Sequence, residues 1–325
     1  MRTTPHHEFP PDKERVHRRA VRLEWLTIAY LLSAIVVIYL TLGSSQAMKT
    51  AWFEDILSLV PPIAFLVASR IRGRRPDSRH PYGWHRAVSI AYLIASLALL
   101  AMGAFLLFDA LMSLGAFEHP SIGTVSLFEH EIWLGWLMIP AAAYSAFPAM
   151  VLGRLKLPLA KELHDRVLIA DAKMNKADWL TGCAAILGVT GIAFGLWWAD
   201  AVAAAVISTD ILHDGISNIR LAVTSLMDAA PERVDESGRE GLPARVETEI
   251  KKLSWVRDAR VRMRDEGHVF FGEVFVVPRD DSRMVERLAE ATERLSALDW
   301  RLHDVVVVPV PSLEEGAGAG PDAAG

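Results

Sequence analysis

Cysteine is almost absent from this chain of 325 residues, since Cys183 is the only one. A single thiol excludes an intrachain disulfide and a metal site built from several thiolates. The HExxH motif of zinc proteases and the GxSxG motif of serine hydrolases are missing as well. We therefore expect neither an enzymatic activity nor a bound cofactor.

Charge is distributed unevenly along the chain. Residues 227–325 contain 14 Lys and Arg against 21 Asp and Glu, although the whole chain has a formal charge of only −5. Such a difference between two parts of a chain indicates that they occupy different environments. The acidic part also argues against nucleic acid as a partner, because phosphate backbones attract basic surfaces.

Long hydrophobic runs are abundant, and 52% of all residues are hydrophobic. A run of about 20 apolar residues is long enough to cross a hydrocarbon core of about 30 Å. We predict an α-helical membrane protein with six transmembrane helices, at residues 23–42, 50–69, 86–113, 132–152, 167–196 and 199–219.

The loops between these runs predict their orientation. Six Lys or Arg lie in residues 1–22, six in residues 70–86 and four in residues 153–166, whereas the opposite loops contain only Lys49. Basic loops stay in the cytoplasm, so both termini are predicted to be cytoplasmic, with residues 1–22 as a cytoplasmic arm. The Ala- and Arg-rich composition suggests a bacterial inner membrane.

The sequence pattern changes after residue 226. Helical spacing at residues 242–256, two strands at 259–265 and 268–278, a helix at 284–298 and a strand at 302–311 follow in the order αββαβ. This order predicts a cytoplasmic ferredoxin-like α+β domain over residues 227–312, after a transmembrane domain over residues 23–226. The Gly- and Ala-rich residues 313–325 predict a disordered tail.

Carboxylates inside the predicted spans indicate a functional site, because a charge at the bilayer centre costs about 2.5–3.5 kcal/mol. Asp55 lies in the second span and Asp178 in the fifth. Asp171 and Asn175 share a helix face with Asp178, since residues seven apart differ by only about 20° around a helix. Their oxygens suit a divalent cation that exchanges with protons, so these four residues form the predicted metal site.

Three features of the chain resemble the cation diffusion facilitator family. HPYGWHR at residues 80–86 resembles the His-Pro-Tyr-Gly loop of that family, and IADAKMNKADWLTG at residues 169–182 resembles its stretch with a membrane aspartate. The third feature is six spans followed by an αββαβ domain. The resemblance covers most of the chain and implies exchange of a divalent metal for protons by a homodimer held through its cytoplasmic domains.

The resemblance also implies where the metal binds. In that family a His or Asp and an Asp four residues later, on each of the second and fifth spans, form a tetrahedral site. The later positions match Asp55 and Asp178, whereas the earlier ones are Ala51 and Met174. Half of the family's ligand set is replaced, which argues against a closed zinc site.

Several interpretations of this replacement remain open. Asn175, Asp171 or Glu54 completes an oxygen site for iron, manganese or cobalt, or the thioether of Met174 favours a softer ion. Asp171 also fits a helix cap, and Glu54 a structural partner of a lysine. Lysines in or near these spans are also candidates for counter-ions of the carboxylates in a carrier of another cation: Lys49, Lys173 and Lys176.

These observations predict a secondary transporter that exports iron, manganese, cobalt or zinc from the cytoplasm. Its predicted partners are the divalent cation, protons, the lipid bilayer and a second copy of the chain. The replaced ligands favour one alternative, a membrane sensor or scaffold that retains the fold without transport. His268 and His303 are isolated candidates for a regulatory metal in the cytoplasmic domain.

Overall fold

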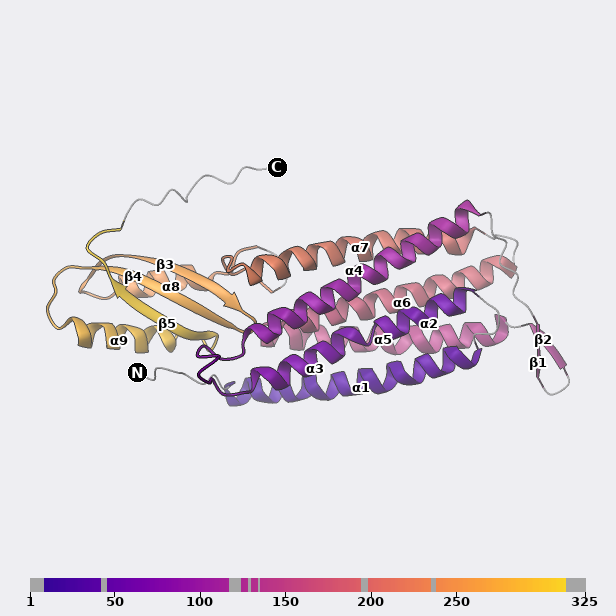
Figure 1. Ribbon diagram of the computed structural model, residues 1–325, viewed down its shortest axis with the longest axis horizontal. Helices are drawn as coiled ribbons and strands as arrows, with labels where there is room; N and C mark the ends of the chain where they lie inside the picture. The colour runs from indigo at the N-terminus through magenta and orange to yellow at the C-terminus, as the bar shows by residue number, and fades with distance from the viewer. Residues whose placement is uncertain are drawn as a thin grey trace.

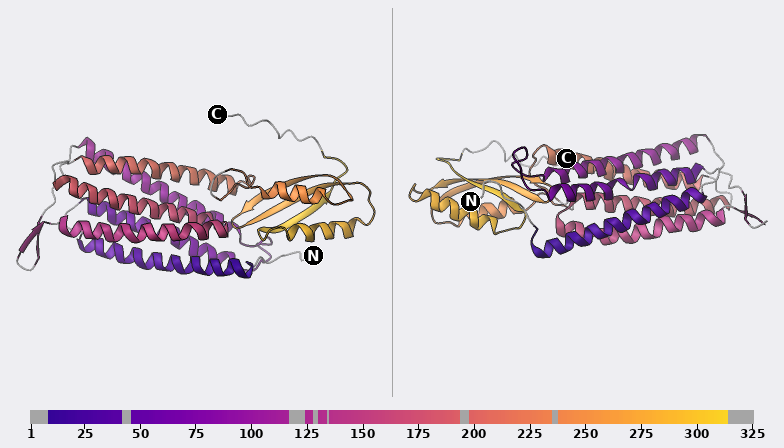
Figure 2. Two further views of the ribbon diagram at one scale, coloured as in Figure 1. Left: turned by 180° about the vertical axis from the view of Figure 1, so that it is seen from behind. Right: turned by 60° about the horizontal axis from the view of Figure 1, so that its bottom comes forward.

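The computed structural model describes residues 9–41, 46–116, 124–127, 130–133, 135–193, 198–234 and 238–313. Figures 1 and 2 show one bundle of long helices, with an α/β domain at one end and a β-hairpin at the other. The helices of the bundle are α1 (Pro11–Thr41), α2 (Gln46–Leu57), α3 (Val60–Arg72), α4 (Arg86–Gly115), α5 (Gly135–Leu163), α6 (Arg166–Ala193) and α7 (Ala199–Leu226).

Four segments of the described residues are long and apolar enough to cross a membrane: Pro11–Leu40, Trp52–Arg72, Arg86–Gly115 and Gly135–Leu163. They overlap the first four predicted spans, although the first begins and the fourth ends well outside the predicted bounds. The other two predicted spans coincide with α6 and α7, each of 28 residues, which carry several charged residues. Large apolar side chains nevertheless face outward on both helices, since Leu187 is 66% exposed and Val206 is 69% exposed.

The second predicted span is not one continuous helix. Helix α2 ends at Leu57 and α3 begins at Val60, directly before Pro61 and Pro62. A proline has no backbone N–H and its ring clashes with the carbonyl four residues earlier, so these two prolines interrupt the helical hydrogen bonds at residues 57 and 58. Ser58 therefore lies at the break between α2 and α3.

The connection between α4 and α5 differs from the prediction of a plain loop followed by a span from residue 132. Strands β1 (Thr124–Leu127) and β2 (His130–Trp133) pair in an antiparallel hairpin, and α5 begins only at Gly135. At its other end α5 continues to Leu163 despite internal prolines, so most of the predicted loop at residues 153–166 is helical. The first helix likewise begins at Pro11, within the predicted arm.

The C-terminal part contains α8 (Leu242–Lys251), β3 (Val256–Glu266), β4 (Val269–Pro278), α9 (Met284–Ser296) and β5 (Leu302–Pro309), which is the predicted order αββαβ. In the described residues these strands form a three-stranded sheet in the order β3-β4-β5, with β4 antiparallel to β3 and parallel to β5. Apolar residues of α8 and α9 pack with the strands in one core. The ferredoxin-like assignment remains a prediction.

Close packing of α4 on α7 depends on two glycines. A Cβ atom at Gly215 would lie 2.8 Å from Leu100 Cα, and one at Gly103 would lie 2.9 Å from the backbone nitrogen of Leu212. Carbon atoms do not approach backbone atoms so closely, so any side chain at either position would force the two helices apart.

We expect Gly215→Val to lower the stability of the helical bundle by about 1–3 kcal/mol, because the added atoms meet backbone of α4. The measurement is thermal unfolding of the detergent-purified protein, followed by loss of the folded species on size exclusion. Gly115→Val is the matched control, since nothing lies within 4 Å of a Cβ atom at that helix end. Equal unfolding of both variants would contradict the packing argument.

Candidate metal-binding site

Asp55 and Asp178 are brought to neighbouring positions inside the bundle. Asp55 lies in the last turn of α2 and is 4% exposed, and Asp178 lies in the middle of α6 and is 6% exposed. The Ser58 hydroxyl donates a hydrogen bond of 2.6 Å to Asp178 Oδ1 and thereby joins the α2–α3 break to α6. The Ser145 hydroxyl of α5 donates a bond of 3.2 Å to Asp55 Oδ1.

One oxygen of each carboxylate is left without a partner. Neither Asp55 Oδ2 nor Asp178 Oδ2 has a hydrogen-bond partner among the described residues, although both atoms are buried. Buried polar atoms are nearly always hydrogen-bonded, and an unsatisfied carboxylate oxygen is costly in an apolar environment. Two such oxygens on facing helices are therefore a candidate for holding a cation.

Small residues between α5 and α6 allow Ser145 of α5 to lie next to Asp55. A Cβ atom at Gly182, one turn after Asp178, would lie only 2.6 Å from the Cβ atom of Ala146. Since Gly182 has no side chain, α5 and α6 approach closely at this level. The residue before Ala146 is Ser145, whose hydroxyl consequently reaches the carboxylate of Asp55.

Asp171 and Asn175 lie on the same helix as Asp178, but Asp171 is already engaged. Its carboxylate is paired with the ammonium group of Lys156 from α5. That ammonium group lies 3.1 Å from Glu24 Oε2 of α1, and all three side chains are at most 1% exposed. Asn175 donates to the backbone oxygen of Asp171 at 2.9 Å, and its side-chain oxygen has no partner among the described residues.

Lys156 and Glu24 were missed by the sequence analysis. The sequence predicts a cytoplasmic loop at Lys156, because hydropathy shows where the apolar run ends and not where the helix ends. Glu24 lies at the start of the first predicted span. An ionisable residue inside a span is a candidate functional residue, so its position alone could have identified it. Together with Asp171 they form a buried ion triad that connects α1, α5 and α6.

The lysines of α6 make ion pairs with α7. Lys173 donates to Asn218 at 2.7 Å and lies 3.5 Å from Asp214, and Lys176 pairs with Asp210 at 2.6 Å. Both lysines of α6 therefore have acidic partners on α7 and are not needed as counter-ions of Asp55 and Asp178. The side chain of Lys49, the third lysine considered as a counter-ion, lies outside the described residues, and so does that of Ala51, one of the two replaced ligand positions.

Met174, the other replaced position, is fully buried in an apolar cluster with residues of α4 and α7. Its neighbours in this cluster include Leu99, Met102 and Ile211. This environment is typical of a methionine that fills space in a core.

The described residues contain no group of three or more His, Cys, Asp and Glu that could hold a metal ion. The candidate site therefore offers two carboxylates, supplemented by the hydroxyls of Ser58 and Ser145. An incomplete shell of oxygen ligands leaves coordination positions for water and suits hard cations such as Mn²⁺ and Mg²⁺ better than zinc.

The turn between α5 and α6 connects this region to the C-terminal domain. His164 has a positive φ of 53°, a conformation that ends helices, and Asp165 Oδ1 accepts bonds of 2.8 and 3.2 Å from the first amides of α6. The ring of His268 from the C-terminal domain contacts this turn. Its Nδ1 lies 3.1 Å from the Leu163 carbonyl oxygen and its Nε2 lies 3.3 Å from Asp165 Oδ2.

Burial shifts the pKa values of both side chains in this contact, His268 and Asp165. It lowers the pKa of His268 well below 6.5 and raises the pKa of the Asp165 carboxyl to about 6. His268 is thus a neutral, packed residue at neutral pH. The other histidine considered for a regulatory metal, His303, lies with its ring centre 4.6 Å from that of His85.

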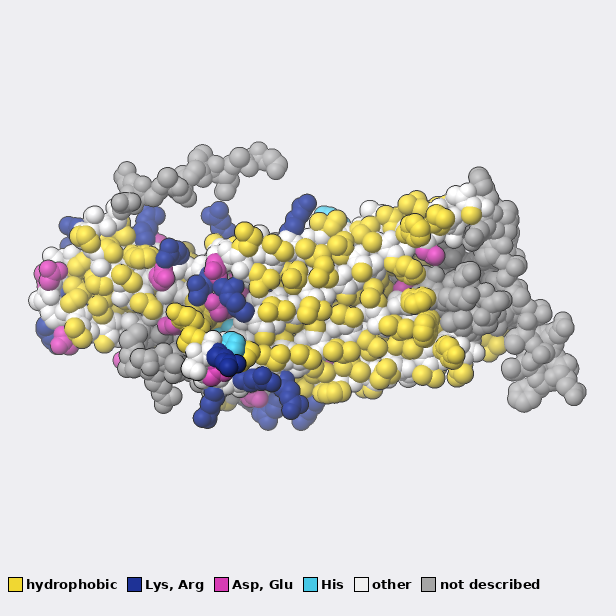
Figure 3. All heavy atoms as spheres, in the orientation of Figure 1, with side chains coloured by type: hydrophobic (Ala, Val, Ile, Leu, Met, Phe, Trp, Pro, Cys, Tyr) yellow, Lys and Arg dark blue, Asp and Glu magenta, His cyan; other side chains and the backbone are white. Residues whose placement is uncertain are grey.

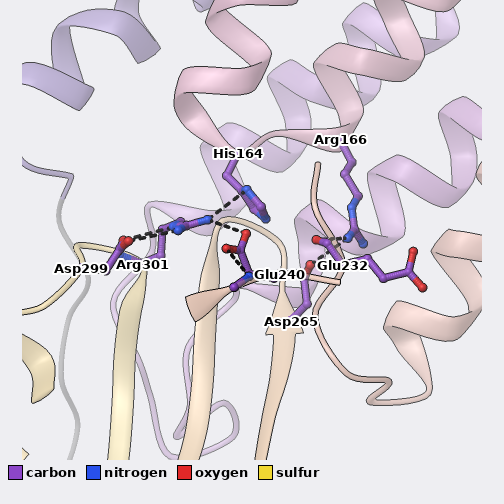
Figure 4. A network of polar contacts seen from close by, with 8 residues as sticks. His164, Arg166, Glu232, Glu240, Asp265, Asp299 and Arg301 are labelled. Atoms are coloured by element: carbon purple, nitrogen blue, oxygen red, sulfur yellow. Dashed lines mark hydrogen bonds and ion pairs between the residues drawn. The ribbon is translucent and has the colours of Figure 1, made fainter. Parts of the chain in front are cut away.

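Arginines extend the contact between the two domains (Figure 4). Arg301 bonds to Glu240 and Asp299 at 3.0 Å and reaches His164 at 3.3 Å. On the other side of the turn, Arg166 lies 3.3 Å from Asp265 and donates to the Glu232 carbonyl oxygen at 3.0 Å. The first residues of α6 are therefore held directly by the C-terminal domain.

Comparison with known proteins places these features in a family. Residues 23–227 match the model of the cation efflux transmembrane domain. The chain is 32% identical over 180 residues to the manganese efflux system protein MneS of Bacillus subtilis, covering 55% of this chain and 58% of MneS. It is 26% identical over 266 residues to the manganese efflux system protein MneP of the same organism, covering 79% of this chain and 82% of MneP.

The magnetosome protein MamB of Magnetospirillum gryphiswaldense is a more distant relative, 26% identical over 188 residues, which are 57% of this chain and 54% of MamB. The chain thus spans little more than half the length of MneS and MamB. The family match covers the helical bundle, including both candidate aspartates, and it agrees with the apolar helices of the fold. The chain belongs to the cation efflux family of membrane transporters, which is the cation diffusion facilitator family that the sequence resembles. This is a family of transporters and not of enzymes.

Proposed function

We propose that this protein exports a divalent metal cation from the cytoplasm, with manganese as its main substrate, in exchange for protons. The observation that carries the proposal is the pair of buried carboxylates, Asp55 and Asp178, each with one oxygen that has no partner among the described residues. A divalent cation between them would neutralise both charges and satisfy both oxygens.

The preference for manganese rests on the donor atoms and on the relatives. Ser58, Ser145 and the two aspartates present only oxygen atoms, which suit hard cations, and zinc prefers nitrogen and sulfur. Two relatives are named as manganese efflux proteins. Asn175 and Asp171, also predicted as ligands, lie one and two turns from Asp178 on the inner side of the site in the proposed orientation. We propose that the Asn175 side-chain oxygen, which has no partner among the described residues, receives the incoming cation, whereas Asp171 stays paired with Lys156.

Exchange for protons follows from the cost of buried charge. Two carboxylates in a bilayer interior are unstable without a compensating positive charge. Once the cation leaves, protons are the compensating charges available to the site. Return to the inward-facing state with protonated carboxylates would couple export to proton entry, as the family resemblance implies.

Six membrane crossings with cytoplasmic termini complete the proposal, with α6 and α7 as the fifth and sixth spans. The exposed apolar side chains of both helices support this assignment. We further propose a transmembrane domain over residues 23–226 and a ferredoxin-like cytoplasmic domain over residues 227–312, flanked by a cytoplasmic arm at residues 1–22 and a tail at residues 313–325.

Orientation is tested by reporter fusions. We expect an alkaline phosphatase reporter to be inactive when fused after Ile219 and active when inserted at Gly123, which lies outside the described residues, because that enzyme folds only on the external side. A fluorescent protein should give the reverse pattern. A cytoplasmic signal at Gly123 would overturn the six-span arrangement.

The proposed homodimer is tested on the full chain in detergent. Mass photometry should give the mass of two chains, and removal of the residues after Leu226 should shift the population toward one chain, because closed twofold pairing would use the cytoplasmic domain. A purely monomeric full-length protein at all concentrations would contradict the dimer.

The metal site is tested by removing its charges. We expect Asp55→Asn and Asp178→Asn each to reduce Mn²⁺ affinity and transport at least about tenfold, or about 1.4 kcal/mol, because the amide keeps the shape and loses the charge. The measurements are titration calorimetry and Mn²⁺ flux in proteoliposomes with a pH-sensitive dye inside.

The control for these variants is Asp210→Asn, an exposed carboxylate of α7 that pairs with Lys176. It should retain most of the Mn²⁺ flux. Native transport in both site variants would exclude this site. Absence of flux for every cation tested in the native protein would favour the alternative, a sensor or scaffold, which the apolar surroundings of Met174 support.

A further inference from the structure

A groove with a volume of about 670 Å³ lies between α3 and α4 at the end of the bundle nearest the C-terminal domain. Small side chains from both helices form its floor: Ala64, Ala68, Ala87 and Ala91. Its apolar walls are open to the surroundings of the bundle, since Val67 is 52% exposed and Ile90 is 51% exposed. Both helices belong to candidate membrane spans, so this apolar part is suited to contact with lipid chains.

The end of the groove toward the C-terminal domain is basic. Arg79 lines it from the segment before α4, Arg86 from the first position of α4 and Arg264 from β3, together with one acid, Glu266. Arg264 donates to Glu266 at 2.9 Å, and Arg86 donates to the Leu226 carbonyl oxygen at 3.1 Å and pairs with Asp228. Arg79 is exposed, and its guanidinium has no carboxylate within ion-pair distance among the described residues.

Many donors of these arginines are available to a ligand. A guanidinium has five N–H donors, and the bonds of Arg86 and Arg264 use only some of them. Among the residues that line the groove, three arginines stand against one carboxylate, Glu266. A phosphate group fits such a cluster, because guanidinium groups bind its oxygens through paired hydrogen bonds.

Aromatic residues mark this end of the groove as a membrane–water interface. Tyr82 is 62% exposed, and the ring of Trp84 stacks on His80 with centres 3.6 Å apart. Tyrosine and tryptophan are enriched at the level of lipid headgroups. On the face in Figure 3, charged and histidine side chains gather where the helices meet the C-terminal domain, and hydrophobic side chains cover the helices beyond.

We propose that this groove binds one anionic phospholipid of the cytoplasmic leaflet, with an acyl chain between α3 and α4 and its phosphate on Arg79, Arg86 and Arg264. Charge complementarity selects the anionic lipid, and basic pockets between helices on the cytoplasmic side are suited to such headgroups. The bound phosphate would bridge α4 and β3 and so fasten the C-terminal domain to the bundle. The proposal requires the proposed orientation but not metal transport.

The test is native mass spectrometry of the full chain released from nanodiscs of mixed phosphatidylglycerol and phosphatidylcholine. We expect the native protein to retain phosphatidylglycerol at least about tenfold more than phosphatidylcholine. Arg79→Gln should abolish this preference, and Ala87→Trp should reduce retention of both lipids by filling the groove. All measurements are made without metal, so the outcome is independent of the transport proposal.

Matched controls are Arg154→Gln and Ala143→Trp, exposed positions of α5 outside the groove, which should behave as the native protein. Normal thermal unfolding in phosphatidylcholine shows that each variant is folded. Three results would overturn the proposal. They are equal retention of the two lipids, loss of preference in Arg154→Gln as well, and unchanged retention in Ala87→Trp. In the last case, a simultaneous shift from dimer to monomer would assign the groove to a second copy of the chain.

Discussion

The ion triad of Glu24, Lys156 and Asp171 is the constraint on which the helical bundle depends. The three side chains are at most 1% exposed, and the single ammonium group of Lys156 is the ion-pair partner of both carboxyl groups, so loss of the lysine would leave two buried acids without a cation. Their positions fix α1, α5 and α6 relative to one another. Asp178 lies two turns beyond Asp171 on the same face of α6, so the triad also fixes the depth and direction of a candidate metal ligand.

A second constraint acts on the opposite side of the site. Pro61 and Pro62 end the helical hydrogen bonding of α2, and the chain resumes as α3 after Ser58. The hydroxyl of Ser58 is thereby directed across the bundle to Asp178 Oδ1, while Asp55 remains in the last turn before the break. A continuous helix would leave this serine as one more residue of the helix surface. The break thus places Ser58 and Asp55 of the second span next to Asp178 at the candidate site, as interrupted helices form binding sites in other transporters.

Much of this arrangement can be predicted from the sequence. Hydropathy identifies the first four spans, strand and helix patterns identify the αββαβ order, and the cost of intramembrane charge identifies Asp55 and Asp178. What the sequence does not show is which charged groups pair. Lys156 looks like a loop residue, because its helix extends past the apolar run that hydropathy measures. The partners of Lys173 and Lys176 lie on α7, a choice that depends on the rotation of one helix against another and not on any local pattern.

Helix α6 is the physical connection between the C-terminal domain and the candidate metal site. Its first residues are held by His268, through Asp165, and by Asp265, through Arg166. Asp178 follows Asp165 by about 20 Å along one uninterrupted helix, at 1.5 Å per residue. A helix transmits tilt and rotation over this distance, so a displacement of the C-terminal domain that moves the α5–α6 turn also moves one of the two carboxylates relative to Asp55. The other carboxylate belongs to α2, beyond the proline break. The two candidate ligands are therefore attached to separately held parts of the protein, so a change in the docking of the C-terminal domain would change the distance between them.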